Sequence, residues 1–182
     1  ELDFNACELR VDLALLGHDQ PAQDLHDWNM ENVFTRTKSR ENAKKRIFSW
    51  LYNPNSTDDK VDKIYDRKIL KDMYFDKVLG KVYTQFGREI DADEDHAISY
   101  IIQSTAADLV FEQMYKIWEF LEDKKSFIKF CNHDSLVIDL AEEDQYDINK
   151  ISKLFSNTRF GKFKVNHEGG KDWAQMKPLH IK

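Results

Sequence analysis

Two short apolar runs near the C-terminal end of the chain constrain its fold most strongly. Residues 127–131 and 136–140 form these runs, and the tetrad Asn132-His133-Asp134-Ser135 separates them. Apolar runs that are joined by turn-forming residues predict a β-hairpin. Elsewhere the apolar residues mostly recur at helical spacing. The sequence therefore predicts an α+β fold, in which long helices pack on a small antiparallel sheet.

Changes in hydrophobic period divide the rest of the chain. A Ser or Thr before an apolar-periodic segment is a typical helix N-cap, so Thr37 or Ser39 is expected to cap one of the helices. A long helix should follow the acidic stretch 89–95 and end near residue 123. The other predicted elements are strands over 2–4 and 163–166 and helices over 6–16, 21–34, 40–52, 58–87 and 144–155.

Composition limits the class of protein. The 182 residues carry a net charge of −6 and are 41% hydrophobic, which suits one globular domain or two small lobes. No apolar run approaches the length of a transmembrane helix and no secretory signal is recognisable, so we expect a soluble cytoplasmic protein without a membrane partner. Cys7 and Cys131 lie among apolar residues without metal-site spacing, which predicts reduced thiols and no structural zinc.

One predicted helix combines positive charge with aromatic rings. Arg40, Lys44, Phe48 and Tyr52 follow one another at i, i+4 steps and so share one side of the helix. Cations suit a triphosphate, and flat rings suit a base or sugar. An ordinary amphipathic helix, with its rings in the core and its cations in water, would show the same spacing.

Two aspartates occupy positions where a short acidic side chain can protrude. Asp3 lies at a strand-to-helix junction, and Asp134 lies at the expected hairpin tip. Two such carboxylates could share Mg²⁺ and support phosphoryl transfer. Aspartates in turns also commonly cap backbone donors, and His133 in the same turn suits a surface residue as well as a ligand. Gln103 lies on a polar stripe of the long helix that suits a helix contact or a DNA minor groove.

Five motifs follow one another along the chain. They are Asp3-Phe4-Asn5-Ala6-Cys7-Glu8-Leu9-Arg10, then Asp24-Leu25-His26, then the Arg40, Lys44, Phe48, Tyr52 series, then Gln103-Ser104-Thr105-Ala106-Ala107-Asp108, and finally His133-Asp134-Ser135. In this order they resemble the family A DNA polymerases, which are DNA polymerase I-like and include the replicative enzymes of T7-like phages. The matched family patterns are D-Y-S-Q-I-E-L-R (motif A), D-[IL]-H, R-x-x-x-K-x-x-x-F-x-x-x-Y-G (motif B), Q-G-T-A-A-D and H-D-E (motif C).

The resemblance implies a role for each matched residue. Asp3 and Asp134 would be the catalytic carboxylates, holding two Mg²⁺ ions for which Mn²⁺ can substitute. His26, Arg40 and Lys44 would contact the triphosphate of a dNTP. Phe48 would stack near the sugar and base of the dNTP, and Tyr52 would lie at the templating base pair. Glu8 would help to exclude a ribose 2′-hydroxyl. Residues implied to contact the primer–template are Arg10, Gln103 and His133.

The resemblance also implies an arrangement of lobes and partners. Residues 1–35 and 93–182 would form the palm, and residues 36–92 would form a shortened, helical fingers lobe. Primer–template DNA and dNTPs would be the partners, in a bacterial or phage-infected cytoplasm. Because thumb and exonuclease segments are not recognisable, we expect a weakly active or inactive fragment that an N-terminal portion or companion subunit completes.

Two departures from the family patterns keep alternatives open. Asn53 stands where motif B ends in Gly, and Ser135 stands where motif C has a second acid. A metal-dependent nuclease or phosphodiesterase would use the same aspartates, and a degenerate, non-catalytic DNA-binding module would tolerate both changes. Template-directed DNA synthesis is the function that the motifs favour.

Overall fold

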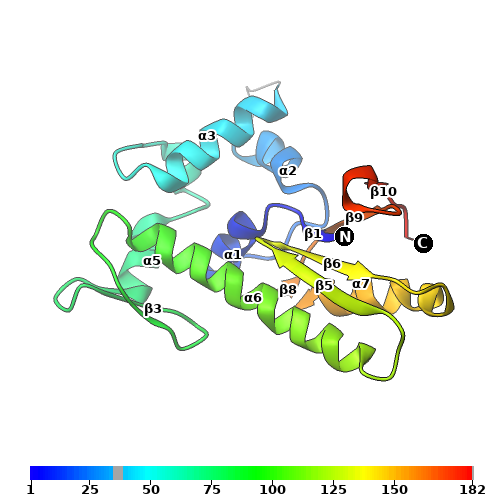
Figure 1. Ribbon diagram of the computed structural model, residues 1–182. Coiled ribbons are helices and arrows are strands. Elements are labelled where there is room, and N and C mark those ends of the chain that lie inside the picture. The colour runs from blue at the N-terminus through cyan, green and yellow to red at the C-terminus, as the bar shows by residue number, and fades with distance from the viewer. Residues whose placement is uncertain (35–38, 182) are drawn as a thin grey trace. The chain divides into compact units, whose positions relative to one another are not determined.

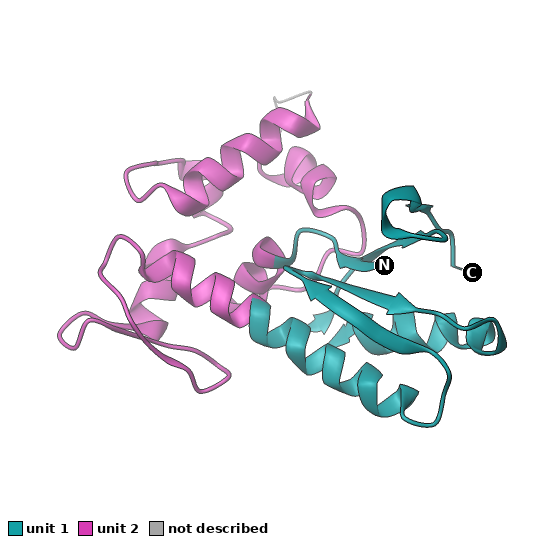
Figure 2. Ribbon diagram, viewed as in Figure 1, with its two compact units in different colours: residues 1–7, 107–182 teal, residues 8–106 magenta. Residues whose placement is uncertain are grey.

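The protein divides into two compact units. The structure, a computed structural model, describes residues 1–34 and 39–181 (Figure 1). Unit 1 comprises Glu1–Cys7 and Ala107–Lys182, and unit 2 comprises Glu8–Ala106 (Figure 2). These units divide the chain at other residues than the predicted palm and fingers do, and the assignment of those lobes stays a prediction.

Unit 1 is built on a five-stranded antiparallel sheet, in which the strand order is β10-β9-β1-β6-β5. Strands β5 and β6 form a hairpin in which Asn132 pairs with Ser135. Strand β1 lies between β6 and β9, and Asp3 pairs with Ser135 on one side and Asn166 on the other. The predicted hairpin and α+β class are confirmed. The bounds are β1 (Leu2–Phe4), β5 (Phe127–Asn132), β6 (Ser135–Asp139), β9 (Val165–Gly169) and β10 (Lys177–Pro178).

The core of unit 1 lies on one face of this sheet. Phe4 stacks on Phe155 of α7 with ring centroids 4.1 Å apart, and Phe163 meets it edge-on at 5.5 Å. Because side chains alternate along a strand, this packing directs Asp3 to the opposite face. The other elements of unit 1 are η1 (Glu142–Asp147), α7 (Ile148–Ser156), β7 (Asn157–Thr158), β8 (Gly161–Lys162) and η2 (Trp173–Gln175).

Unit 2 is mainly helical. Its elements are α1 (Cys7–Leu15, of which Cys7 belongs to unit 1), α2 (Leu25–Asn32), α3 (Arg40–Tyr52), α4 (Asp59–Asp62), α5 (Arg67–Tyr74) and a sheet of β2 (Phe75–Asp76), β3 (Lys81–Tyr83) and β4 (Glu89–Asp91). The long helix α6 (Ala97–Leu121) starts in unit 2 and ends in unit 1. It confirms the predicted long helix.

Helix α3 has the predicted bounds. The Ser39 hydroxyl accepts a hydrogen bond from the Asn42 amide at 3.3 Å, so Ser39 is the N-cap, and Thr37 lies outside the described residues. After the helix, the Arg67 guanidinium donates to the carbonyls of Trp50 at 2.8 Å and Asn53 at 3.1 Å. These bonds satisfy carbonyls at the end of α3, where intrahelical partners run out.

Several predicted boundaries are wrong. The predicted helix over 58–87 is instead two short helices, α4 and α5, which are followed by the three strands of unit 2. Gly80 and Gly87 adopt the positive φ values of tight turns among these strands. The helix expected from residue 21 begins at Leu25, because the Asp24 carboxylate caps it. The helix over 144–155 starts as a 3₁₀ segment, and the strand over 163–166 runs instead from Val165 to Gly169.

Two further predictions concern thiols and membranes. Cys7 and Cys131 are free cysteines, as expected. Among the helices of the described residues, none carries an apolar stretch long enough to cross a lipid bilayer.

A carboxyl group is buried without a partner inside unit 2. Asp12 on α1 has no exposed surface, and neither of its carboxylate oxygens accepts a hydrogen bond from the described residues. Burial and the neighbouring Asp66 raise the pKa of Asp12 well above its ordinary value, and Arg67 partly offsets this effect. A carboxyl group whose pKa is raised in the folded state contributes its full stabilisation below its unfolded-state pKa, which is about 4 for an Asp. This contribution to the free energy of unfolding is lost as the pH rises toward the folded-state pKa.

We therefore expect Asp12→Asn to flatten the pH dependence of stability. Between pH 4 and pH 8 the wild-type protein should lose free energy of unfolding relative to the variant, by up to about 1.4 kcal/mol per pH unit. Urea unfolding of both proteins across this range would measure the difference. Asp19→Asn, at an exposed position, is the control and should follow the wild-type curve. Parallel curves for wild type and Asp12→Asn would contradict the expectation.

Candidate active site

Two neighbouring strands bring the predicted catalytic aspartates together in unit 1. Asp3 lies in β1, and Asp134 lies in the turn that leads into β6. The amide of Phe4 donates to the carbonyl oxygen of Asp134 at 3.2 Å, and Asp3 pairs with Ser135. The sheet register thus places two carboxylates side by side that are 131 positions apart in the sequence.

Backbone strain is located beside both aspartates. Among the described residues, Ala6 (φ 55°) and His133 (φ 52°) are the non-glycine residues with positive φ. Ala6 follows β1 at its junction with α1, and His133 directly precedes Asp134 in the hairpin turn. Left-handed backbone is costly for residues with a Cβ atom, and such strain concentrates at functional sites.

The electrostatics of Asp3 indicate a site for a cation. The pKa of Asp3 is raised to about 6, first by burial and further by the nearby carboxylates of Asp134, Glu1 and Glu168. A hydrogen bond from the Asn166 amide to Asp3 Oδ2, at 3.1 Å, opposes this rise. A divalent cation at this face would offset the repulsion between the carboxylates.

The donor atoms suit magnesium. Within the described residues no group of three or more His, Cys, Asp and Glu side chains is close enough to hold a metal ion. Mg²⁺ is commonly held by only one or two carboxylates, with water and substrate phosphates completing its shell. Asp3 lines a hollow of about 620 Å³, and Asp134 is not among the residues that line it. Two neighbouring carboxylates, Asp3 and Asp134, match in number and type the protein ligands that Mg²⁺ commonly uses.

Unit 2 carries the predicted cationic face on α3. The side chains of Arg40 and Lys44 are exposed, and those of Phe48 and Tyr52 are partly buried. Arg40 donates to Asp24 Oδ2 at 2.8 Å and lies 3.5 Å from Asp27. Lys44 forms no ion pair with the described residues, so its charge is available to a bound anion.

Three aromatic side chains continue this face. His26 and Phe48 have ring centroids 6.0 Å apart, and Phe48 and Tyr52 stack at the same distance with nearly parallel rings. His26 is 5% exposed, and its Nδ1 has no hydrogen-bond partner among the described residues. Burial, Arg40 and Lys44 lower the pKa of His26, which keeps a neutral ring beside two cations. Nδ1 is therefore a buried hydrogen-bonding group that the described residues leave unsatisfied.

The Tyr52 hydroxyl connects three of the predicted residues within unit 2. It donates a hydrogen bond to Glu8 Oε2 and also interacts with the side chain of Gln103 on α6. Burial and the Glu8 carboxylate raise the pKa of Tyr52, so the phenol stays protonated and donates. The structure therefore brings together Glu8, Tyr52 and Gln103, which belong to three separate motifs.

Arg10 and His133 lie in different surroundings. Arg10 is fully buried, and its guanidinium donates to the carbonyls of Pro21 at 2.8 Å and Gln23 at 2.9 Å. It holds the segment that leads to the Asp24 cap of α2, so any effect on DNA binding would act through that segment. His133 is exposed at the hairpin turn. DNA contacts remain predictions for both residues.

Sequence reasoning missed three residues around the aspartates. Asn166 hydrogen-bonds to Asp3, and both Glu1 and Glu168 act on its carboxylate. Asn166 and Glu168 come from β9, whose place beside β1 follows from sheet pairing and carries no local motif. The strand-like pattern over 163–166 was the one available signal, and it did not reveal the partner strand.

Comparison with solved structures identifies the fold. The structure has the fold of the polymerase domain of DNA polymerase I. It is similar to the Pol1 polymerase domain of M. smegmatis, solved in complex with DNA primer-template and dNTP, with a TM-score of 0.69 and 19% identity over 90% of this chain and 38% of that one.

A sequence relative agrees with this fold. Over 93 residues the chain is 32% identical to DNA polymerase I of Borreliella burgdorferi (strain ATCC 35210 / DSM 4680 / CIP 102532 / B31). The matched region covers 48% of this chain and 10% of that protein. No protein-family profile matches the chain. The resemblance to the family A DNA polymerases, which the five motifs indicated, is confirmed by these two comparisons.

Proposed function

We propose that this protein is a DNA-directed DNA polymerase that transfers nucleotides from dNTPs to a primer 3′-hydroxyl on a template. One observation supports the proposal above all: β1 and β6 pair so that Asp3 and Asp134 lie side by side in unit 1. Two such carboxylates suit phosphoryl transfer, which needs stabilisation of charge more than a protein nucleophile. The names of both similar proteins, a DNA polymerase I and a Pol1 polymerase domain, agree with this activity.

Unit 1 would hold the metal ions. Asp3 and Asp134 would bind two Mg²⁺ ions, or Mn²⁺ in their place, and Asn166 would orient the Asp3 carboxylate. Bound metal would lower the barrier by neutralising charge on the attacking and leaving oxygens. The raised pKa of Asp3, about 6, means that the metal competes with a proton at this carboxylate below that pH.

Unit 2 would bind the nucleotide. Lys44 and Arg40 would bind the triphosphate, with Asp24 and Asp27 orienting the Arg40 guanidinium. Phe48 would contact the sugar and base, and Glu8, held by Tyr52, would exclude a 2′-hydroxyl. Gln103 and His133 would contact the primer–template, in which a Gln amide can donate to the minor-groove acceptors of any base pair. The palm and fingers assignments of residues 1–35, 36–92 and 93–182 belong to the same proposal.

Primer extension tests the proposal directly. The purified protein would be incubated with a labelled primer on a template, with dNTPs and Mg²⁺ or Mn²⁺, and with a parallel reaction that lacks dNTPs. Extension that follows the template sequence is the expected result. Shortening of the primer without dNTPs would instead favour a metal-dependent nuclease, and DNA binding without either reaction would favour a non-catalytic module.

Phe48 predicts how the site treats a nucleotide that lacks its 3′-hydroxyl. The Phe48 ring has no hydroxyl that could replace a hydrogen bond lost with that group. We therefore expect Phe48→Tyr to incorporate dideoxynucleotides relative to dNTPs at least about tenfold better than wild type. Competition between each ddNTP and its dNTP during extension would measure the ratio. An unchanged ratio in Phe48→Tyr would contradict the position assigned to this ring.

A further inference from the structure

A third carboxylate in unit 1 is held in a fixed orientation beside the two aspartates. Glu1 directly precedes β1, and the ladder with β9 continues through it, because the main-chain nitrogen of Glu1 donates to the Glu168 carbonyl at 2.8 Å and its carbonyl accepts from the Glu168 amide at 3.0 Å. Side chains two positions apart on a strand share a face. Glu1 therefore lies on the same face as Asp3, with buried Leu2 on the other.

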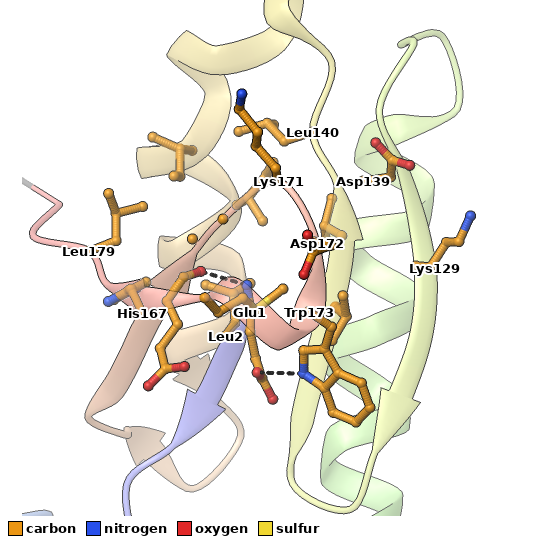
Figure 3. A pocket seen from close by; sticks show the side chains of 18 of the residues that line it. Glu1, Leu2, Lys129, Asp139, Leu140, His167, Lys171, Asp172, Trp173 and Leu179 are labelled. Atoms are coloured by element: carbon orange, nitrogen blue, oxygen red, sulfur yellow. Dashed lines mark hydrogen bonds between the residues drawn. The ribbon is translucent and has the colours of Figure 1, made fainter.

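Both oxygens of the Glu1 carboxylate accept hydrogen bonds. The Ser135 hydroxyl is 2.7 Å from Oε1. The Trp173 indole nitrogen donates to Oε2 at 3.1 Å (Figure 3). Ser135 is 3% exposed, so this contact is shielded from bulk water. Two donors from separate elements, β6 and η2, thus restrict a side chain that would otherwise sample many rotamers.

The Ser135 contact gives Glu1 a particular significance. Ser135 follows Asp134, at the position where the motif C pattern H-D-E has a second acid. In this protein that position carries a neutral hydroxyl, which is hydrogen-bonded to a carboxylate supplied by the other metal-binding strand. The negative charge missing from the motif is therefore present next to it, on the residue that precedes β1.

We propose that Glu1 is a positioning residue of the metal site, whose carboxylate supplies the charge that Ser135 does not. This inference rests on the proposed function. Glu1 is not assigned as a ligand, because in the part of the chain that the structure describes no third acidic side chain joins Asp3 and Asp134 closely enough to coordinate one ion. It acts through its negative charge, which attracts cations to this face.

A purely structural explanation makes a different prediction. Trp173 lies in the C-terminal segment, and its ring also meets Phe130 edge-on with centroids 5.0 Å apart. If Glu1 served only to fasten this segment, then Trp173→Phe, which keeps an aromatic side chain and removes the N–H donor, would reproduce the effect of Glu1→Gln. If Glu1 acts by its charge, Trp173→Phe should leave metal affinity close to the wild-type value.

Mn²⁺ binding without DNA or dNTP tests the proposal. Electron paramagnetic resonance of free Mn²⁺ would give the affinity of wild type, Glu1→Gln, Trp173→Phe and the double variant Glu1→Gln with Ser135→Asp. We expect Glu1→Gln to weaken Mn²⁺ binding about fivefold to tenfold. The double variant, which moves the charge to the motif C position, should return to within about twofold of wild type.

Two results would contradict the proposed role of the Glu1 charge. Wild-type affinity in Glu1→Gln, or no recovery in the double variant when thermal unfolding is unchanged, would overturn the role of the Glu1 charge. Asp134→Asn, measured alongside, separates the two proposals. If Asp134→Asn loses Mn²⁺ binding and Glu1→Gln does not, only the inference about Glu1 fails. If Asp134→Asn binds as tightly as wild type, the proposed metal site itself fails.

Discussion

Replacing Asp134 by Asn is expected to reduce metal-dependent primer extension at least about a thousandfold. The amide keeps the size of the side chain and removes the charge that would hold the metal ions beside Asp3. Because the Asp134 carbonyl, and not its side chain, accepts the hydrogen bond from Phe4, the pairing of β1 with the hairpin should survive. Steady-state extension rates in Mg²⁺ and in Mn²⁺ would measure the loss.

A nearby aspartate provides the matched control. Asp139 is an exposed residue at the far end of β6, so Asp139→Asn removes the same charge from the same strand. We expect this variant to extend primers at close to the wild-type rate, and both variants to unfold near the wild-type temperature. Undiminished extension by folded Asp134→Asn would refute the assignment of the metal-binding carboxylates.

Replacing Lys44 by Ala should produce the second large effect, a reduction of about a hundredfold in kcat/KM for dNTP. Lys44 is exposed on α3 and forms no ion pair with the described residues, so its loss should not leave an unpaired partner in the protein. A lysine that binds a triphosphate contributes a charge-assisted hydrogen bond that an alanine cannot replace. Single-nucleotide incorporation at varied dNTP concentration would measure the change.

The next residue on the same helix is the control. Lys45 is also exposed, but it pairs with Glu41 at 3.5 Å. Surface pairs of this kind contribute little to stability, so Lys45→Ala should keep both the fold and the dNTP kinetics. Equal effects of the two substitutions would show that general positive charge on α3, and not a defined contact at Lys44, binds the nucleotide.

Local sequence signals predicted the parts of the fold that depend on near neighbours. The bounds of α3 follow from its apolar period, the Ser39 cap and Pro54 beyond its end. The hairpin of β5 and β6 follows from two apolar runs and a turn of Asn, His, Asp and Ser. The segment over 58–87 was mistaken for helix because a high charge density hid two turns at Gly80 and Gly87.

The candidate site divides in the same way. The order of the motifs pointed to Asp3, Asp134 and the residues of α3 as candidate site residues, because each lies in a short pattern with its own chemistry. Asn166 and Trp173 stand in no such pattern, and their contacts with Asp3 and Glu1 arise from pairing across the sheet and from the fold of the C-terminal segment. Nor did any spacing indicate that Asp12 would be buried without a partner.

The sequence by itself determined the α+β class and the cationic face of one helix, and its motifs singled out two acidic residues as candidates, since each depends on a local period or a contiguous motif. Only the tertiary structure decided that β1 lies between β6 and β9, which places Asp3 beside Asp134 and Asn166 and places Glu1 against Ser135. The reason is physical. The place of β1 depends on burial in a shared core, in which Phe4 packs against Phe155 of α7 and Phe163. Such long-range packing leaves no periodic trace in the three residues of β1 alone.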